Sequence, residues 1–402
     1  MSTEENEIFA HAMSMVNCFS LPTVFTTAME LNVFKIINEL SKDDGGGGGA
    51  SPLEISSRLQ TENPEAASMV DRMLHLLANY SLLTCSVRTS EGGLVERVYG
   101  IGPVSKFFLT EQDGGSLAYL SFLNSHAAHA KARSSLKDAV LEGGVPFEKA
   151  HADIDPRFSS IFNKAMASHS IIILKKILET YKGFEGLNSL VDVGGGDGST
   201  LNMIINKYPS IRGINYDLPH VIQHLLPSLG IENIEGNMFE AVPKGDAVLL
   251  KFFSSKKRCG ASMAGSELFQ KWSNFRDSPT FLSTSVLYEE ICGSWATLLK
   301  LIELQSICHN WNDEQCVTLL KNCYKALPET GKVIIIDPLM PEAAETNFTG
   351  KLVAELDITM LISLGGRERT EREFAALSKA AGFSCLKVVS CVYAHSILDV
   401  HK

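Results

Sequence analysis

The chain has 402 residues, which is long enough for two domains, and 45% of its residues are hydrophobic, as in an ordinary globular protein. Its formal net charge of -10 opposes a nucleic-acid or anionic-membrane partner. The acidic N-terminus does not match a secretory signal, and no run of 18 apolar residues predicts a membrane span. The nine cysteines include no C-x-x-C pair, which favours reduced thiols in a cytoplasmic protein over disulfides or a metal site.

The N-terminal part is predicted to be mainly helical. Apolar residues recur at helical spacing from Glu7 to Leu40, and a glycine spacer follows at 45–49. Ser51 and Glu54 have the spacing of a capping box, and a further helix and a hairpin-like segment come next. Two helices and a hairpin are the outline of a winged helix, but the second helix offers little positive charge for phosphates. A protein–protein interface is therefore preferred over DNA binding.

From about residue 188, strand and helix patterns alternate. Short runs of branched apolar residues, typical of buried parallel strands, are "SLVDVG", "RGINYDL", "DAVLLK" and "KVIIIDPLM". Amphipathic patterns such as "TLNMIINKY" and "EQCVTLLKNCYKAL" lie between them. The alternation predicts a doubly wound, mainly parallel α/β sheet, with its ligand at the carboxyl ends of the strands.

The stretch "SLVDVGGGDGST", residues 189–200, predicts a cofactor loop. A nicotinamide fingerprint places Gly or Ala where this chain has Ser199. The order acidic-x-G-x-G-x-G, which starts at Asp192, fits the loop of S-adenosylmethionine methyltransferases better. Asp217 ends the next strand and is suited to bind ribose hydroxyls, although NAD enzymes use a carboxylate in the same way and a helix N-cap is an alternative role.

Several longer motifs in fixed order resemble plant small-molecule O-methyltransferases of the caffeic acid type. They are "LVDVGGGDG", "GINYDLPHVI", "GNMF", "GDAVLLK", "ICHNWNDEQC", "GKVIIIDPLMP" and "GGRERTEREFAALSKAAGF". The resemblance runs over nearly the whole chain and implies S-adenosylmethionine as methyl donor, a small phenolic acceptor and a homodimer. It places a winged-helix-like dimerisation domain at 1–115 and the methyltransferase domain at 116–402.

The resemblance also assigns the residues that would contact the cofactor: Gly194, Asp217, Asn237, Met238 and Lys251. Asn237 stands where many relatives have Asp. An amide can still bond to the adenine edge, but without charge assistance, so weaker binding is expected.

By the same resemblance, His309 matches the catalytic base, and Asp337 and Glu368 match two carboxylates that flank it. The chemistry requires a phenolate, because a free phenol has a pKa of about 10. A neutral histidine can take the proton as transfer begins, and a carboxylate on its other nitrogen fixes the tautomer. From the residues alone, His309 could instead be a buried structural histidine, and Asp337 could be a cap at the end of a strand. Glu368 would then form a surface salt bridge with Arg367 or Arg369.

Four residues fall on one face of a predicted helix against which the resemblance places the acceptor ring: Phe158, Phe162, Met166 and His169. Ordinary core packing is the alternative. Further candidates for the acceptor pocket are Asn124, Ile358, Thr359 and Ser363. The segment just before this helix is shorter than in the family, so the acceptor stays open among caffeic acid derivatives, flavonoids, other phenols and N-acetylserotonin.

A departure from the family separates Lys251 from His309. In the family the histidine follows the lysine by four residues, and removal of 252–305 restores that spacing. The preferred hypothesis is a retained intron or gene-model artefact. The alternative is a tolerated surface insertion, since long loops add little closure entropy. A protein that binds the cofactor but is inactive or impaired is therefore a second functional class, and a redox enzyme is a distant third.

Overall fold

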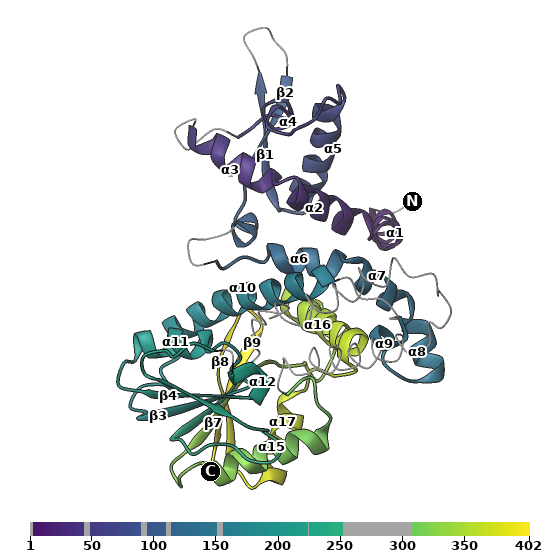
Figure 1. Cartoon of the computed structure of the whole chain (residues 1–402). Helices are drawn as coiled ribbons and strands as arrows, with labels where there is room; N and C mark the ends of the chain where they lie inside the picture. Colours follow the sequence, from purple (N-terminus) through teal and green to yellow (C-terminus); the bar gives the residue numbers. More distant parts are fainter. Residues whose placement is uncertain are drawn as a thin grey trace, which may run out of the picture. The chain divides into compact units, whose positions relative to one another are not determined.

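The structure is a computed structural model (Figure 1), and it describes residues 3–43, 49–89, 95–109, 114–150, 156–223, 225–251 and 308–402. The predicted insertion at 252–305 lies outside the described residues. The chain divides into two units, Met1–Ala130 and Lys131–Lys402.

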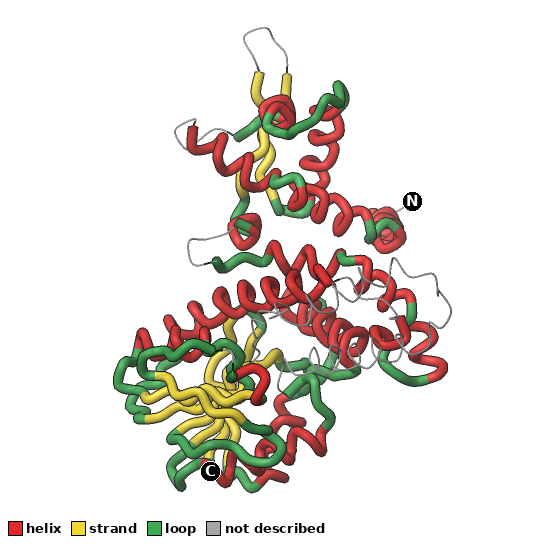
Figure 2. Tube along the Cα trace, in the orientation of Figure 1, coloured by secondary structure: helices red, strands yellow, loops and turns green. Residues whose placement is uncertain are grey.

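The first unit consists of helices and one antiparallel hairpin (Figure 2). Its elements are α1 (Thr3–Val16), α2 (Ser20–Glu30), α3 (Val33–Asp43), α4 (Pro52–Ser57), α5 (Ala66–Asn79), β1 (Leu83–Thr89), β2 (Val95–Ile101), a short 3-10 helix at Ser105–Phe108, and α6 (Ala118–Ser125). The helical period predicted from Glu7 to Leu40 is thus divided among three helices. The predicted capping box is confirmed: the Ser51 hydroxyl accepts from the Glu54 N–H at 3.2 Å, and Glu54 Oε2 accepts from the Ser51 N–H at 2.6 Å.

In the described chain, no single helix is long and apolar enough to cross a membrane. One helix pair, Glu4–Val16 with Ser20–Glu30, meets the criterion by length and composition, with a bend of 54° between its halves. Exposed apolar side chains on the first of these helices include Ile8 and Phe9.

The second unit is built on a seven-stranded sheet of order β5-β4-β3-β6-β7-β9-β8. All neighbouring strands from β5 to β7 pair in parallel, while β9 is antiparallel to both β7 and β8. The strands are β3 (Ser189–Val193), β4 (Arg212–Asp217), β5 (Ile231–Glu235), β6 (Ala247–Lys251), β7 (Lys332–Pro338), β8 (Cys385–Val392) and β9 (His395–His401). The four predicted strands and the mainly parallel α/β class are confirmed, and three further strands extend the sheet.

Helices cover both faces of this sheet (Figure 1). One face of the sheet packs against α10 (Pro156–Thr180) and α11 (Ser199–Lys207). The other face packs against α15 (Asp313–Ala326) and α17 (Glu371–Ala381). The remaining helices are α8 (Leu136–Glu142), α9 (Pro146–Ala150), α12 (Pro219–Ile222) and α16 (Phe348–Leu364), and α7 (Ala127–Ser134) spans the division between the units.

The alternation of side chains along the strands decides which polar residues reach which face. Leu190 and Leu249 pack in the α10/α11 core, so Asp192 and Lys251, each two residues further on, point to that same face. Ile335 packs in the α15/α17 core, and Asp337 therefore points to the other face. Polar side chains thus lie on both faces of the sheet at the carboxyl ends of its strands.

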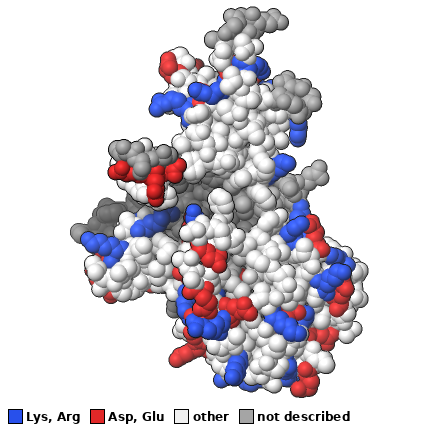
Figure 3. Space-filling view, turned by 180° about the vertical axis from the view of Figure 1, so that it is seen from behind, with Lys and Arg blue, Asp and Glu red and all other residues white. Residues whose placement is uncertain are grey.

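Charged side chains of both signs are interspersed on the face shown in Figure 3. Ion pairs such as Arg212–Glu232 at 3.1 Å and Arg372–Glu342 at 3.0 Å are exposed. Exposed pairs of this kind contribute little to stability.

Candidate active site

The glycine loop between β3 and α11 needs its glycines for two separate reasons. Gly194, Gly196 and Gly198 have φ values of 70°, 59° and 75°, in the left-handed region that glycine adopts without a steric penalty. Gly195 is required by close approach, since a Cβ there would lie 2.2 Å from Asn215 Oδ1. The shape of the loop therefore depends on glycine at all four positions.

Asp217, at the end of the neighbouring strand β4, accepts hydrogen bonds from the backbone of this loop and of the next residue. Its Oδ2 accepts from the Gly196 N–H at 2.9 Å, and its Oδ1 accepts from the Leu218 N–H at 2.7 Å. Burial raises the pKa of Asp217, and these two hydrogen bonds oppose the increase. Each oxygen accepts one bond from the backbone and keeps a lone pair for a ligand hydroxyl.

The floor of the loop is polar and buried. Asp192 and Lys251 are 1% and 2% exposed. Burial raises the pKa of Asp192 and lowers that of Lys251, while the attraction between the two charges opposes both shifts. Within the described ranges, Asp192 Oδ2 and Asn215 Oδ1 have no hydrogen-bond partner. Buried polar atoms without partners cost free energy, so this floor fits a ligand with polar groups of its own.

Asn237 and Met238 follow β5. Asn237 Oδ1 accepts from the Phe239 N–H at 3.1 Å, and its Nδ2 donates to Glu240 Oε1 at 3.0 Å. Met238 is partly buried against the α15/α17 core, and its carbonyl accepts from Asn322 Nδ2 at 3.0 Å. The amide predicted to face the adenine is therefore held by a local turn.

His309 and Glu368 meet on the α15/α17 side of the sheet. His309 Nδ1 lies 2.8 Å from Glu368 Oε1, and the two side chains are 6% and 1% exposed. Burial alone would lower the pKa of His309, but the charge and hydrogen bond of Glu368, together with the charge of Asp337, raise it. A carboxylate can only accept, so Nδ1 carries the hydrogen and Nε2 presents the lone pair.

Asp337, at the end of β7, is 3% exposed. Burial raises its pKa to about 7, against the attraction of His309, while the charge of Glu368 raises it further. The two carboxyl groups near His309 therefore differ, because Glu368 is hydrogen-bonded to the ring, whereas Asp337 acts on it through its charge. Arg367 forms ion pairs with Asp313 and Glu373, not with Glu368.

Arg369 holds the loop that carries His309, a role the sequence reasoning missed. The side chain is 1% exposed and donates to the carbonyls of Cys308 and Trp311, the second at 2.6 Å. It also donates to Asp313 Oδ1 through Nη2 at 2.8 Å and through Nε at 3.0 Å. One guanidinium thus connects the residues on both sides of His309. The only sequence signal is its place next to Glu368, since a buried arginine cannot be told from an exposed one by residue type.

The predicted aromatic face lies on α10. The Phe158 and Phe162 rings are 6.3 Å apart, Met166 is buried, and His169 follows on the same helix. The His169 ring lies 5.3 Å from the ring of His395, which the sequence reasoning also missed. Burial lowers the pKa of His169 to about 3, and the charges of His395 and Lys251 add to the effect.

The other acceptor candidates lie on two further helices, α16 and α6. Ile358 and Thr359 lie on α16, where Ile358 is 46% exposed and the Thr359 hydroxyl donates to the Glu355 carbonyl at 2.8 Å. The buried Ser363 hydroxyl has no hydrogen-bond partner among the described residues. Asn124 lies on α6 in the first unit and is exposed. These four assignments stay predictions.

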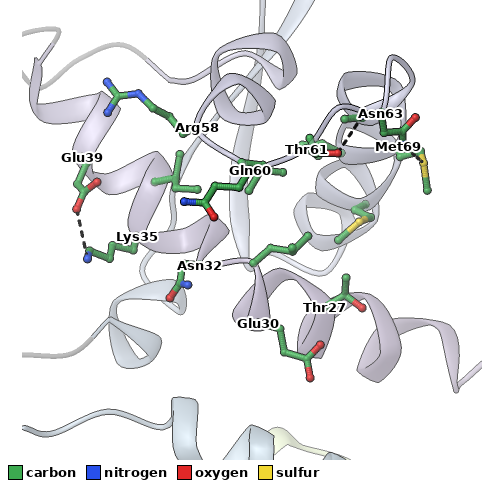
Figure 4. Close-up of a pocket in the computed structure, with 16 residues that line it drawn as sticks. Thr27, Glu30, Asn32, Lys35, Glu39, Arg58, Gln60, Thr61, Asn63 and Met69 are labelled. Carbon is green, nitrogen blue, oxygen red and sulfur yellow. Dashed lines mark hydrogen bonds and ion pairs between the residues drawn. The ribbon is translucent and has the colours of Figure 1, made fainter.

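A separate hollow of about 680 Å³ lies within the first unit (Figure 4). Its wall comes from α2, α3, α5 and the segment after α4, and includes the exposed pair Lys35–Glu39 at 3.8 Å. None of the predicted site residues is among those that line it. In the described part of the chain, no cluster of His, Cys, Asp or Glu is arranged to hold a metal ion.

A mainly parallel seven-stranded sheet with this glycine loop defines a methyltransferase fold, and solved structures support that class. The chain matches human N-acetylserotonin methyltransferase, in a structure with S-adenosylmethionine, at a TM-score of 0.68 and 18% identity over 100% of this chain and 99% of that one. It matches a calicheamicin-biosynthesis methyltransferase, in a form with bound S-adenosylhomocysteine, at a TM-score of 0.68 and 19% identity over 100% of both chains.

The family follows from the sequence comparisons. The O-methyltransferase domain model matches residues 134–255 and 299–384, and the O-methyltransferase dimerisation domain model matches residues 13–111. The chain is 42% identical to a caffeic acid 3-O-methyltransferase of Rosa chinensis over 100% of this chain and 96% of the relative. It is 40% identical to caffeic acid 3-O-methyltransferase 1 of Ocimum basilicum over 100% and 98%. The chain belongs to the plant O-methyltransferase family of the caffeic acid type, whose methyl donor is S-adenosylmethionine.

Proposed function

We propose that this enzyme transfers a methyl group from S-adenosylmethionine to a phenolic hydroxyl of a small aromatic acceptor, with His309 as general base. The contact that carries the proposal is the 2.8 Å bond between His309 Nδ1 and Glu368 Oε1. It leaves Nε2 as the basic nitrogen, and the negative charge of Glu368 stabilises the ring once it has taken the proton. Proton removal by a placed base contributes roughly 10²–10⁴-fold.

The residues around the glycine loop would hold the donor. Asp217 would accept hydrogen bonds from ribose hydroxyls, while Gly194, Met238 and Asn237 would contact the rest of the molecule. Asp192 and Lys251 would supply opposite charges to the polar amino-acid end at the loop floor. When bound, S-adenosylmethionine supplies a methyl group on a positively charged sulfur, which leaves with the electron pair of the carbon–sulfur bond. His309 takes the phenol proton as the new oxygen–carbon bond forms and later releases it to solvent.

The acceptor class is inferred from the relatives and from α10. The curated relatives act on caffeic acid by name. Phe158, Phe162 and Met166 present an apolar aromatic face suited to a phenolic ring, and His169 adds a polar group at its end. Asp337 is proposed as the second carboxyl group beside His309.

We further propose a homodimer formed through an N-terminal winged-helix-like domain at 1–115, with the catalytic domain at 116–402. The dimerisation model, which matches residues 13–111, supports this division. The described cysteines are all free thiols, which suits the cytoplasm.

Incubation of the purified protein with labelled S-adenosylmethionine and a panel of phenols tests the proposal. The panel would hold caffeic acid, a flavonoid with two adjacent hydroxyls, and N-acetylserotonin. We expect label in at least one phenol, and loss of that label in His309→Gln with unchanged binding of S-adenosylhomocysteine. Transfer that persists in His309→Gln at the parental rate would contradict the role of the base.

The second candidate is a protein that binds the cofactor but is inactive or impaired because of residues 252–305. The observation that favours it is the break in the family match, which omits residues 256–298 between Lys251 and His309. Against it, the charges of both Lys251 and His309 act on the same buried side chain, His395, so the two residues lie near one another. Deletion of 252–305 distinguishes the two: a faster deletion variant supports impairment, whereas a slower or unfolded one shows that the segment belongs to the enzyme.

A further inference from the structure

His395 begins β9 at the edge of the sheet where β6 and β7 end. In the antiparallel ladder it pairs with Pro338, and the next residue, Ser396, pairs with Asp337. The side chain of His395 is buried, with the residue 6% exposed. A histidine from an antiparallel strand therefore enters the carboxyl edge where this fold binds its ligands.

The side chain points to the α10 face of the sheet. Ile397, two residues further along β9, packs in the α10/α11 core, and strand alternation places His395 on the same side. Its ring lies 5.3 Å from the His169 ring at an interplanar angle of 55°. His395 thus adjoins the end of the aromatic face proposed for the acceptor.

The hydrogen bonding of His395 fixes its tautomer. Nδ1 lies 3.0 Å from the Tyr393 carbonyl oxygen, which can only accept, so Nδ1 carries the hydrogen and Nε2 has the lone pair. Burial lowers the pKa of His395 to about 4; its bond to Tyr393 opposes this shift, and the charges of Lys251 and His309 add to it. The ring is therefore a neutral acceptor at physiological pH, with Nε2 as its accepting atom.

A strained turn supports this arrangement. Tyr393 and Ala394 connect β8 to β9 and have φ values of 48° and 66°. Two-residue hairpin turns with both φ values positive favour Asn-Gly, not a bulky residue followed by alanine. Such strain persists where the surrounding structure requires it, often at functional sites. Here it presents the Tyr393 carbonyl to His395 Nδ1.

We propose that His395 is a substrate-positioning residue whose Nε2 accepts a hydrogen bond from a second hydroxyl of the aromatic acceptor. The inference rests on the proposed methyl transfer and deepens it, because it names a preference for acceptors with two hydroxyls over those with one. His309 takes the proton from the hydroxyl that is methylated, and His395 orients the ring through the other.

The test measures acceptor binding and turnover with three probes: caffeic acid, which has two hydroxyls, and the two monohydroxycinnamic acids that each keep one. In His395→Asn the amide still donates to the Tyr393 carbonyl, but nothing replaces Nε2. We expect the Kd of caffeic acid, measured by calorimetry with S-adenosylhomocysteine present, and its KM to rise about 5- to 10-fold, as for one lost hydrogen bond. The monohydroxy probe that lacks the hydroxyl bound by His395 should change by less than about twofold, whereas the probe that keeps this hydroxyl should weaken about as much as caffeic acid.

His395→Gln, which places a polar atom near the Nε2 position, should restore part of the preference. His401→Asn, at the far end of the same strand, is the matched control and should change nothing. An equal loss for all three probes, or unchanged caffeic acid binding in a folded His395→Asn, would overturn the proposal. If His395→Asn unfolds, a folded His395→Gln variant that weakens all three probes equally would overturn it as well. A parent that binds caffeic acid but transfers no methyl group refutes the proposed function without refuting this one.

Discussion

The buried guanidinium of Arg369 offers the sharpest test of how the loop around His309 is held. Arg369→Met keeps most of the side-chain volume and removes every donor. The carbonyls of Cys308 and Trp311 then keep only weak donors: the Cys316 thiol at 3.4 and 3.7 Å and, for Cys308, the Trp311 N–H at 3.5 Å. Each lost bond to the buried guanidinium costs about 1–3 kcal/mol. The lost pair with Asp313 adds little, because that side chain is 54% exposed. We expect a destabilisation of about 2–6 kcal/mol, or roughly 4–24 °C in the midpoint of thermal unfolding for a unit of this size.

Arg367→Met is the matched control. Arg367 also pairs with Asp313, at 3.1 Å, but it is 46% exposed, so its removal should cost less than about 1 kcal/mol. Thermal unfolding followed by circular dichroism compares the two variants. Turnover of Arg369→Met should also fall about 100-fold, because a shift of about 1 Å in a catalytic group has that effect. Midpoints of the two variants within about 3 °C of each other would refute the reasoning, since that gap corresponds to about 1 kcal/mol.

Four further predictions concern the glycine loop and the proposed base, His309. Gly195→Ala should weaken S-adenosylhomocysteine binding at least 10-fold in calorimetry, because its Cβ would lie 2.2 Å from Asn215 Oδ1. Gly186→Ala is the control: its Cβ meets nothing within 4 Å, so its positive φ of 79° should lower stability but leave binding unchanged. Equal effects on binding would exclude the close-approach explanation. Below the raised pKa of His309 the base is protonated, so kcat/KM should fall as the pH falls through that value. Glu368→Gln removes the charge that raises this pKa and should move the acid limb of the pH profile to lower pH. An acid limb that stays in place would show that it does not report the protonation of His309. His309→Gln should lower kcat by about 10²–10⁴-fold at neutral pH. Its activity should recover partly as the pH rises toward the pKa of the free phenol. Remaining activity that does not depend on pH would indicate another base.

The sheet was predictable where a strand is buried on both faces. β3, β6 and β7 are almost wholly buried and read as continuous apolar runs, as central parallel strands do. β5 and β8 lie at the two edges of the sheet, and their mixed burial gives no such run. The pattern of the central strands therefore identified the fold class, while the edges required tertiary pairing to become visible.

The candidate site divides in a similar way. The glycine loop is local, because its spacing in the chain sets its shape, and its left-handed glycines follow from that spacing. His309 and Glu368 were named only through the family resemblance, and their contact joins residues 59 positions apart. Arg369 and His395 were missed because their roles come from burial and from contacts across the fold. No local pattern distinguishes a histidine that starts a buried antiparallel strand from one on the surface.

The hydrogen bond from Gly196 to Asp217 means that the cofactor loop has its shape before any ligand arrives. A loop that is already ordered loses little conformational entropy on binding, so more of each contact appears as affinity. Asp217 would then act twice, once as a brace for the backbone and once as a partner for the ribose. Its replacement by alanine should slow association as well as speed dissociation, because each encounter would first have to find the loop in its binding shape.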